Sequence, residues 1–200
     1  MAGFAAVLAL GACDEASDEP NEPVARVFVG EIDGTDIDVA VLVDGDAIAV
    51  YQCGGPQTVA TQTRWYRGTI GTDDDVDAFV LETDGVQVVG RITEDGTVEA
   101  DLVQADDTRA AMRVDPVDDD ADAGVFVEGD ADRDTAVIVQ GEGTDLSAQG
   151  ASCSAGTCSS VIILPPIVID ASKIAVQITD GTSNILDVTV AKTLAPPGGF

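Results

Sequence analysis

Short apolar runs separated by Asp-Gly pairs make up most of the chain from Val24 onward. Residues 97–103 and 173–179 alternate between apolar and polar side chains, which is typical of a strand with one buried face. The continuous apolar run at 39–43 predicts a strand that is covered on both faces. No amphipathic stretch of helical period and useful length accompanies these runs.

The Asp-Gly pairs predict tight turns between the strands, because both residues tolerate a positive φ angle. They stand at 33–34, 44–45, 84–85, 95–96 and 180–181. We therefore expect an all-β fold, an antiparallel meander that forms a barrel or a sandwich, with a shorter C-terminal β segment. The expected strands are 25–32, 37–43, 47–53, 64–70, 77–83, 86–92, 97–103, 108–114, 124–128, 134–140, 160–164, 173–179 and 185–190.

Composition divides the chain into segments. The pattern of strands is interrupted near 116–122 and again at 129–134, where acidic residues cluster. The expected organisation is a signal peptide at 1–12, an acidic flexible tether at 13–24, a β-meander domain at 25–128, a C-terminal β segment at 129–193 and a tail at 194–200. The C-terminal segment is short for a core of its own, so it either packs on the first unit or forms a small separate domain.

The first residues have the features of an export signal. Residues 2–12 form an apolar run that is too short to span a bilayer as a helix and fits the apolar region of a signal peptide. The run ends in Leu10-Gly11-Ala12-Cys13, which resembles the lipobox of bacterial lipoproteins. That resemblance implies a lipid on Cys13 and a protein anchored to a membrane on the extracytoplasmic side of the cell envelope. The alternative is a buried N-terminal strand in which Cys13 occurs by chance.

The charge balance excludes one class of partner. The chain has 9 Lys and Arg against 37 Asp and Glu, a net charge of −28. Such a surface repels phosphate backbones, so we expect no nucleic-acid binding. Two explanations remain for the acidity, a solubilising surface and cation binding. The chain contains no His, which excludes His-based triads and imidazole metal ligands.

Part of the first unit resembles a known kind of module. The stretches at 29–36, 39–46, 49–53 and 65–68 are similar to an uncharacterised β-rich module of secreted actinobacterial and other bacterial proteins. The resemblance implies an extracytoplasmic location and an all-β fold. It implies no catalytic residues.

Three cysteines remain beside Cys13. Cys153 and Cys158 enclose four residues of a loop rich in Ser, Gly and Ala, and a local disulfide between them suits an oxidising compartment. The alternative pairs Cys53 with one of them.

Two other groups of residues are candidate sites. Asp130, Asp132 and Asp134 place carboxylates at every second residue, as calcium-binding loops do, although the glycine of an EF-hand loop is missing. Ca²⁺ is therefore the one cofactor that the sequence suggests. Arg64, Trp65 and Arg67 could form a binding surface for a sugar or a peptide. The alternative places Trp65 in the core with the arginine stems beside it.

These observations favour a non-enzymatic cell-envelope lipoprotein, a structural or binding module whose protein or glycan partner is unknown. One alternative is a Ca²⁺-dependent adhesion or ligand-binding domain. The other is a carboxylate-based hydrolase, which the scarcity of aromatic residues disfavours, since the chain has one Trp and two Tyr. No nucleophile motif of the GxSxG kind and no phosphate-binding glycine loop is present.

Overall fold

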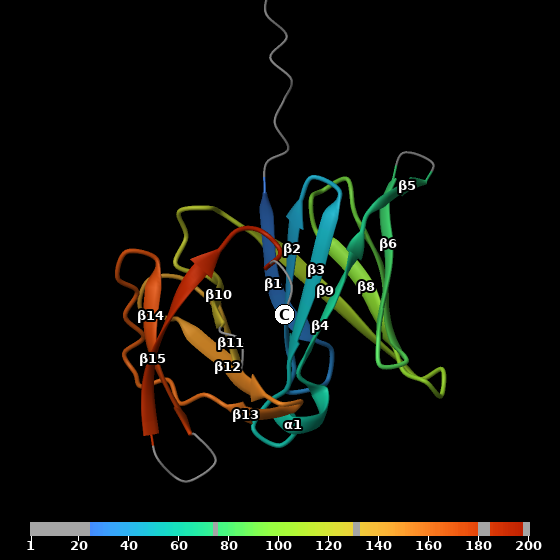
Figure 1. The fold of residues 1–200 in the computed structure, drawn as a ribbon. Helices are drawn as coiled ribbons and strands as arrows, with labels where there is room; N and C mark the ends of the chain where they lie inside the picture. Colours follow the sequence, from blue (N-terminus) through green and yellow to red (C-terminus); the bar gives the residue numbers. More distant parts are fainter. Residues whose placement is uncertain (1–24, 74–75, 130–132, 180–184, 198–200) are drawn as a thin grey trace, which may run out of the picture.

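The computed structural model describes residues 25–73, 76–129, 133–179 and 185–197. They form an all-β structure of two antiparallel sheets, which confirms the expected fold class (Figure 1). The strands are β1 Arg26–Ile32, β2 Asp38–Asp44, β3 Ala47–Cys53, β4 Arg64–Thr69, β5 Gly71–Asp73, β6 Val76–Thr83, β7 Val86–Ile92, β8 Val98–Val103, β9 Arg109–Val117, β10 Gly124–Gly129, β11 Asp134–Gln140, β12 Ser147–Ser154, β13 Thr157–Ser160, β14 Lys173–Thr179 and β15 Ile185–Thr193. A single-turn helix, α1 Val59–Gln62, joins β3 to β4.

The large sheet has the strand order β4-β3-β2-β1-β9-β8-β7-β6-β5. Two meanders meet in it, because β1 pairs antiparallel with β2 on one side and with β9 on the other. The sheet curls until β4 lies beside β6, where the Thr83 hydroxyl donates a hydrogen bond of 2.9 Å to the Trp65 carbonyl. The result is a nearly closed barrel.

Every second side chain of the large sheet points into the barrel. This alternation follows from the pleat of a strand and explains the apolar spacing in the sequence. We call these residues the barrel core: Phe28, Ile32, Ile37, Val39, Val41, Val43, Ile48, Val50, Tyr66, Phe79, Leu81, Val86, Val88, Ile92, Val98, Ala100, Leu102, Met112 and Val114. Four of the expected turns are described, and each places its glycine at a positive φ, between 62° and 81°.

The small sheet has the strand order β13-β12-β11-β10-β15-β14. Its two ends are linked by an irregular stretch, in which the Val161 amide donates to the Gly150 carbonyl and Ile162 pairs with Gln177. The small-sheet core consists of Phe126, Val137, Val139, Ile174, Val176, Ile178 and Val190. Ile174, Val176 and Ile178 face inward as their alternation predicts.

The two sheets pack on each other through their outer faces. Strand β2 is buried on both sides, as its continuous apolar run predicts: Val41 faces the barrel core, whereas Leu42 faces the small sheet. We call the apolar cluster between the sheets the interface: Val27, Ala40, Leu42, Tyr51, Cys53, Val59, Val125, Ala136, Ile138 and Ala151. The Tyr51 hydroxyl crosses it to the Ala136 carbonyl at 3.3 Å, and the Gln149 amide crosses it to the Cys53 carbonyl at 2.7 Å.

The chain changes from one sheet to the other between Val117 and Gly124. The sequence pattern places the strand at 124–128 in the first unit, but β10 pairs with β11 and β15 in the small sheet. The change of sheet therefore coincides with the first of the two acidic interruptions in the pattern. Among the described residues, no helix has the length and apolar composition needed to cross a bilayer.

Candidate binding surfaces

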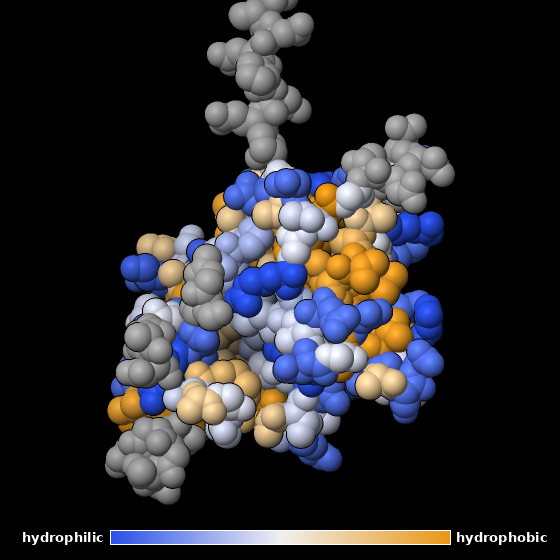
Figure 2. Space-filling model, turned by 45° about the vertical axis from the view of Figure 1, so that its right-hand side comes forward, coloured by the Kyte–Doolittle hydropathy of each residue, from blue (hydrophilic) through white to orange (hydrophobic). Residues whose placement is uncertain are grey.

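A shallow hollow of about 700 Å³ lies on the outer face of strands β6 to β9. Ala78, Val89 and Ala111 give it an apolar floor, because small side chains at these outward positions leave room above the sheet. Charged side chains line the rest of the hollow, namely Asp33, Arg91, Glu99, Asp101 and Arg113. Figure 2 shows apolar surface bordered by hydrophilic surface on the side of the large sheet. The hollow therefore offers an apolar contact area within a charged rim.

A row of charges of alternating sign crosses the hollow. Arg91 on β7, Glu99 on β8 and Arg113 on β9 lie opposite one another in the strand register. The Glu99 carboxylate accepts a hydrogen bond of 3.0 Å from Arg91 and one of 3.2 Å from Arg113. All three side chains are exposed, and such surface ion pairs each stabilise a fold by about 0.5 kcal/mol. Their main effect is on the chemistry of the surface, which presents donors and acceptors side by side.

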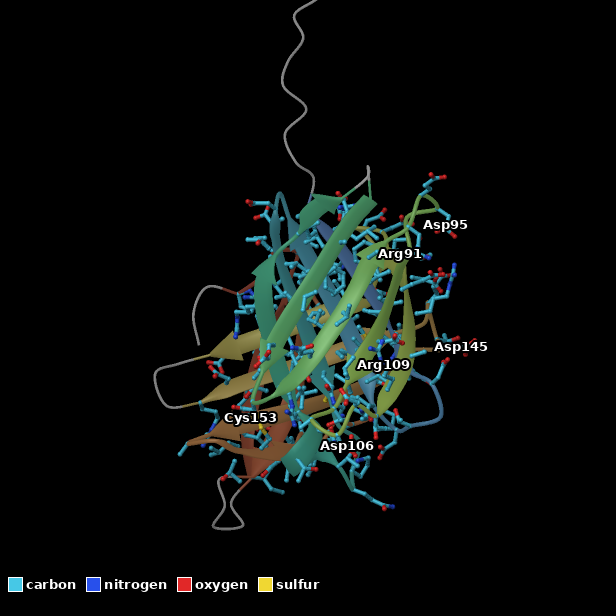
Figure 3. All side chains as sticks on the ribbon, turned by 90° about the vertical axis from the view of Figure 1, so that its right-hand side faces the viewer. Arg91, Asp95, Asp106, Arg109, Asp145 and Cys153 are labelled. Atoms are coloured by element: carbon cyan, nitrogen blue, oxygen red, sulfur yellow. A yellow bond between two sulfur atoms is a disulfide. The ribbon has the colours of Figure 1, made fainter. Side chains whose placement is uncertain are left out.

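Further ion pairs extend this row along β8 and β9. Arg109 pairs with Asp101 at 3.3 Å, and Arg113 also reaches Asp95 at 3.3 Å. Figure 3 shows Arg91 and Arg109 on one face of the large sheet, with Asp95 in the hairpin between β7 and β8. Hydrogen bonds from Thr93 and Thr97 lower the pKa of the Asp95 carboxyl to about 2, so it stays ionised. Three of the nine basic residues of the chain thus share one face.

The aromatic and cationic residues singled out in the sequence lie at the edge of the interface. The Trp65 ring stacks on Tyr51 with 4.6 Å between centroids, and the Arg67 guanidinium lies 5.2 Å from the Trp65 centroid. Burial lowers the pKa of Arg67, and the negative charge of Asp134 opposes that shift. Trp65 and Arg67 are therefore brought together with Tyr51 and Asp134.

Arg64 does not join that stack. It is the neighbour of Trp65 on β4, so its side chain leaves from the opposite face of the strand. Its guanidinium donates to the Thr61 carbonyl at the end of α1. Beside it the Tyr66 hydroxyl donates to Gln52, whose amide donates to Gln62, so these hydrogen bonds link β4 to β3 and β3 to α1. Arg64 therefore does not share a surface with Trp65 and Arg67.

Of the three candidate calcium ligands, Asp130 and Asp132 lie outside the described residues. Asp134 is half-buried at the start of β11, opposite Cys153. Within the part of the chain that the structure describes, no three acidic, Cys or His side chains gather as a metal site. The calcium hypothesis stays a prediction, which melting in Ca²⁺ and in EDTA at equal ionic strength would test.

The acidic stretch 118–122 surrounds a cation that belongs to the protein itself. The half-buried Lys192 ammonium donates to the Asp119 carbonyl at 3.1 Å and to the Ala121 carbonyl at 2.7 Å. Burial lowers the pKa of Lys192, whereas the charges of Asp119, Asp122 and Asp120 raise it. Lys192 therefore fastens the segment between the sheets to β15.

The cysteines have separate roles. Cys153 and Cys158 form a disulfide across β12 and β13, which confirms the predicted pairing. Cys53 is a free thiol and fully buried in the interface. Burial raises its pKa to about 12, so it stays protonated and unreactive in the folded protein. Cys13 lies outside the described residues.

A second surface is apolar. We define the apolar segment as residues 161–169, which link β13 to β14 along the side of the small sheet that faces away from the large sheet (Figure 1). A hollow of about 270 Å³ lies between this segment and β14. It is lined by aliphatic side chains together with Gln177 and Asp187, and it has no nucleophile or acid–base pair.

Sequence reasoning missed both hollows. The charged row joins residues from three strands, and only the register brings them together. The signal for the apolar segment was present, since the nine residues from Val161 to Ile169 are all apolar, but we expected part of it, 160–164, as a strand. The regular strand β13 instead ends at Ser160, and Ile162 makes an isolated bridge with Gln177.

Fold and surfaces together define a protein of two packed antiparallel β-sheets with shallow surface hollows. No protein-family model, curated protein or solved structure matches the chain.

Proposed function

We propose that this protein is a non-enzymatic lipoprotein of the bacterial cell envelope, anchored through Cys13, whose all-β part is a structural or binding module. The observation that carries the proposal is the sequence Leu10-Gly11-Ala12-Cys13 at the end of an apolar run, followed by the acidic stretch 13–24. The Cys153–Cys158 disulfide supports export, because such bonds persist in oxidising compartments.

The hollow on β6 to β9 supports binding in preference to catalysis. The Glu99 carboxylate is engaged by Arg91 and Arg113, the Asp101 carboxylate is engaged by Arg109, and the hollow is open to solvent. Catalytic carboxyl groups usually lie in a dry pocket that shifts their pKa. An apolar floor with a rim of donors and acceptors instead suits a protein or glycan partner.

Replacement of Cys13 tests the anchor. In cells fed a labelled fatty acid, the wild-type protein should incorporate label and sediment with membranes. Cys13→Ser should lose the label and either leave the membrane fraction or remain unprocessed. Cys53→Ala is the matched control, because it removes a thiol elsewhere and should keep both properties. Wild-type protein that carries no label and fractionates like Cys13→Ser would refute the proposal.

A further inference from the structure

One long stretch of this acidic chain carries no charge. The chain has 46 charged residues among 200, yet none occurs in the 24 residues from Leu146 to Ile169. This run includes β12 and β13, which lie partly against the large sheet, and the apolar segment, which continues from β13 toward β14 on the side away from it. The absence of charge is therefore concentrated in one region of the fold.

The apolar segment exposes large side chains there. Alternate residues point inward and pack on the small-sheet core: Val161, Ile163, Ile167 and Ile169. The others point outward, with Ile162 41%, Leu164 60% and Val168 65% exposed. Inward packing keeps the segment on the small sheet, so the outward side chains face solvent. Exposed aliphatic side chains gathered in this way indicate a contact surface.

The borders of this surface are polar. Asp187 is the charged residue at the rim of the hollow, and its carboxylate accepts a hydrogen bond of 3.1 Å from Gln177. Asp170 and Lys173 follow the segment and pair through their backbones. An uncharged apolar centre with polar groups around it matches the layered chemistry of a bilayer surface, where acyl chains lie beneath polar headgroups.

The expected tether, residues 13–24, has a length that matters for which surface reaches the membrane. Twelve residues at 13–24 span up to about 40 Å when extended. A domain of this length has a radius of gyration of about 16 Å, so its diameter is close to the reach of the tether. Faces that do not lie directly opposite the start of β1 can then turn toward the bilayer, and chemistry decides which one does. Acidic faces are repelled by anionic headgroups, whereas the uncharged face is not.

We propose that the apolar segment rests on the bilayer that holds the lipid of Cys13, with Ile162, Leu164 and Val168 inserted among the headgroups. This inference depends on the proposed function for its anchor and goes beyond it by giving the domain an orientation. The hollow on β6 to β9 belongs to the other sheet and stays available to a partner.

Two tryptophan variants test the contact in the full-length lipidated protein. Val168 and Val80 are matched, being 65% and 64% exposed, but Val80 lies on β6 of the large sheet. Val168→Trp and Val80→Trp are reconstituted into phosphatidylcholine vesicles with bromine in the acyl chains, and wild-type protein supplies the Trp65 background. Quenching should remove about half of the added emission at position 168 and almost none at position 80, since interfacial side chains reach the acyl boundary.

Equal quenching at the two positions, or none at either while the protein stays on the vesicles, would overturn the inference. So would self-association of the wild-type protein that Val168→Asp abolishes and Val80→Asp does not, because a second copy would then cover the segment. The fatty-acid label separates the two proposals. If the protein carries the fatty-acid label but shows no selective quenching, the proposed orientation is refuted and the proposed anchor stands. If it carries no label but shows selective quenching, only the proposed anchor is refuted.

Discussion

The two sheets complete their cores in different ways. The large sheet curls until β4 meets β6, so strands enclose the barrel core almost completely. The small sheet has too few strands for this, and the apolar segment fills the gap between β12 and β14. An irregular segment used in this way must be apolar on its inner side. This one is apolar on its outer side as well, which closure alone does not require.

The connections explain the difference. Most connections of the large sheet are tight hairpins, although α1 joins β3 to β4. Asp84 and Gly85 both adopt positive φ angles, as the turn that matches strand twist requires. Strands joined in this way stay in register and continue the curl. The small sheet instead has a connection from Val161 to Ser172 between β13 and β14. We therefore expect the barrel to be the more rigid part and the small sheet the more adaptable one.

Deleting one aromatic ring from each core gives the largest effect and tests this difference directly. Phe28 and Phe126 are both fully buried, one in the barrel core and the other in the small-sheet core. Phe28→Ala should lower the free energy of unfolding by about 3–5 kcal/mol, because a closed barrel cannot collapse around the cavity. Phe126→Ala should cost about 2–3 kcal/mol, since the apolar segment can move inward. Urea unfolding followed by circular dichroism measures both, and equal losses would show that the two cores are alike in rigidity.

The disulfide belongs to the more adaptable sheet, and removing it gives the next largest effect. The double substitution Cys153→Ala, Cys158→Ala should lower the free energy of unfolding by about 2 kcal/mol, because the disulfide no longer restricts the unfolded chain and the loop that it closes is short. Cys53→Ala, in the interface, is the control that keeps the disulfide. Mass spectrometry of native protein should find Cys53 unmodified by iodoacetamide until urea unfolds the chain, and rapid modification without denaturant would contradict its burial.

Lys192 fastens the segment that connects the two sheets, and its loss has a smaller effect. Lys192→Met keeps the aliphatic stem over Gly124 but removes the ammonium that binds two carbonyls, so it should cost about 1–2 kcal/mol. The loss should shrink in high salt, where the charges of 118–122 are screened. Lys173→Met, on the exposed start of β14, should change stability by less than about 0.5 kcal/mol. Equal effects of the two substitutions would mean that Lys192 does not fasten the segment.

Much of the fold could be predicted because its signals are local. Alternation at 97–103 and 173–179, the continuous run at 39–43 and four of the five Asp-Gly turns each correspond to an observed strand or hairpin, whereas the turn expected at 180–181 lies outside the described residues. Strand β12 was missed, because SAQGASCS has no apolar alternation. Its Gly150 lies so close to Val137 and Val161 that a Cβ there would meet atoms at 2.6 Å and 2.8 Å. Such packing depends on the neighbouring strands and leaves no periodic trace.

The candidate surfaces could be predicted less well. The disulfide was predictable, since Cys153 and Cys158 are close in sequence. The row of Arg91, Glu99 and Arg113 was not, because the register of three strands creates it. Residues chosen for their chemistry alone, Arg64 and Arg67, leave β4 on opposite faces and have different surroundings. Local signals therefore determine the elements, and pairing determines which side chains meet.

The smallest effect concerns an acidic residue where the two sheets meet. Asp38 is half-buried at the start of β2. Burial raises its pKa to about 6, and the negative charges of Glu31 and Asp36 add to that rise. A hydrogen bond from Gln140 on β11 acts in the opposite direction. A raised pKa means that ionising Asp38 costs more in the folded than in the unfolded protein. Its contribution to stability is therefore complete below pH 4 and is lost as pH rises through 6.

Asp38→Asn removes this ionisation and keeps an oxygen acceptor for Gln140. At pH 8 the variant should be more stable than the wild-type protein by about 1 kcal/mol, a value reduced for the partial exposure of the side chain. The advantage should disappear near pH 4, where the wild-type carboxyl is protonated in the folded state. Asp44→Asn, at an exposed position on the same strand, is the control for the loss of one negative charge. Melting temperatures from pH 4 to pH 8 measure the difference. If the melting temperatures of wild type and Asp38→Asn differ by the same amount at every pH, packing of the two sheets does not desolvate the Asp38 carboxyl.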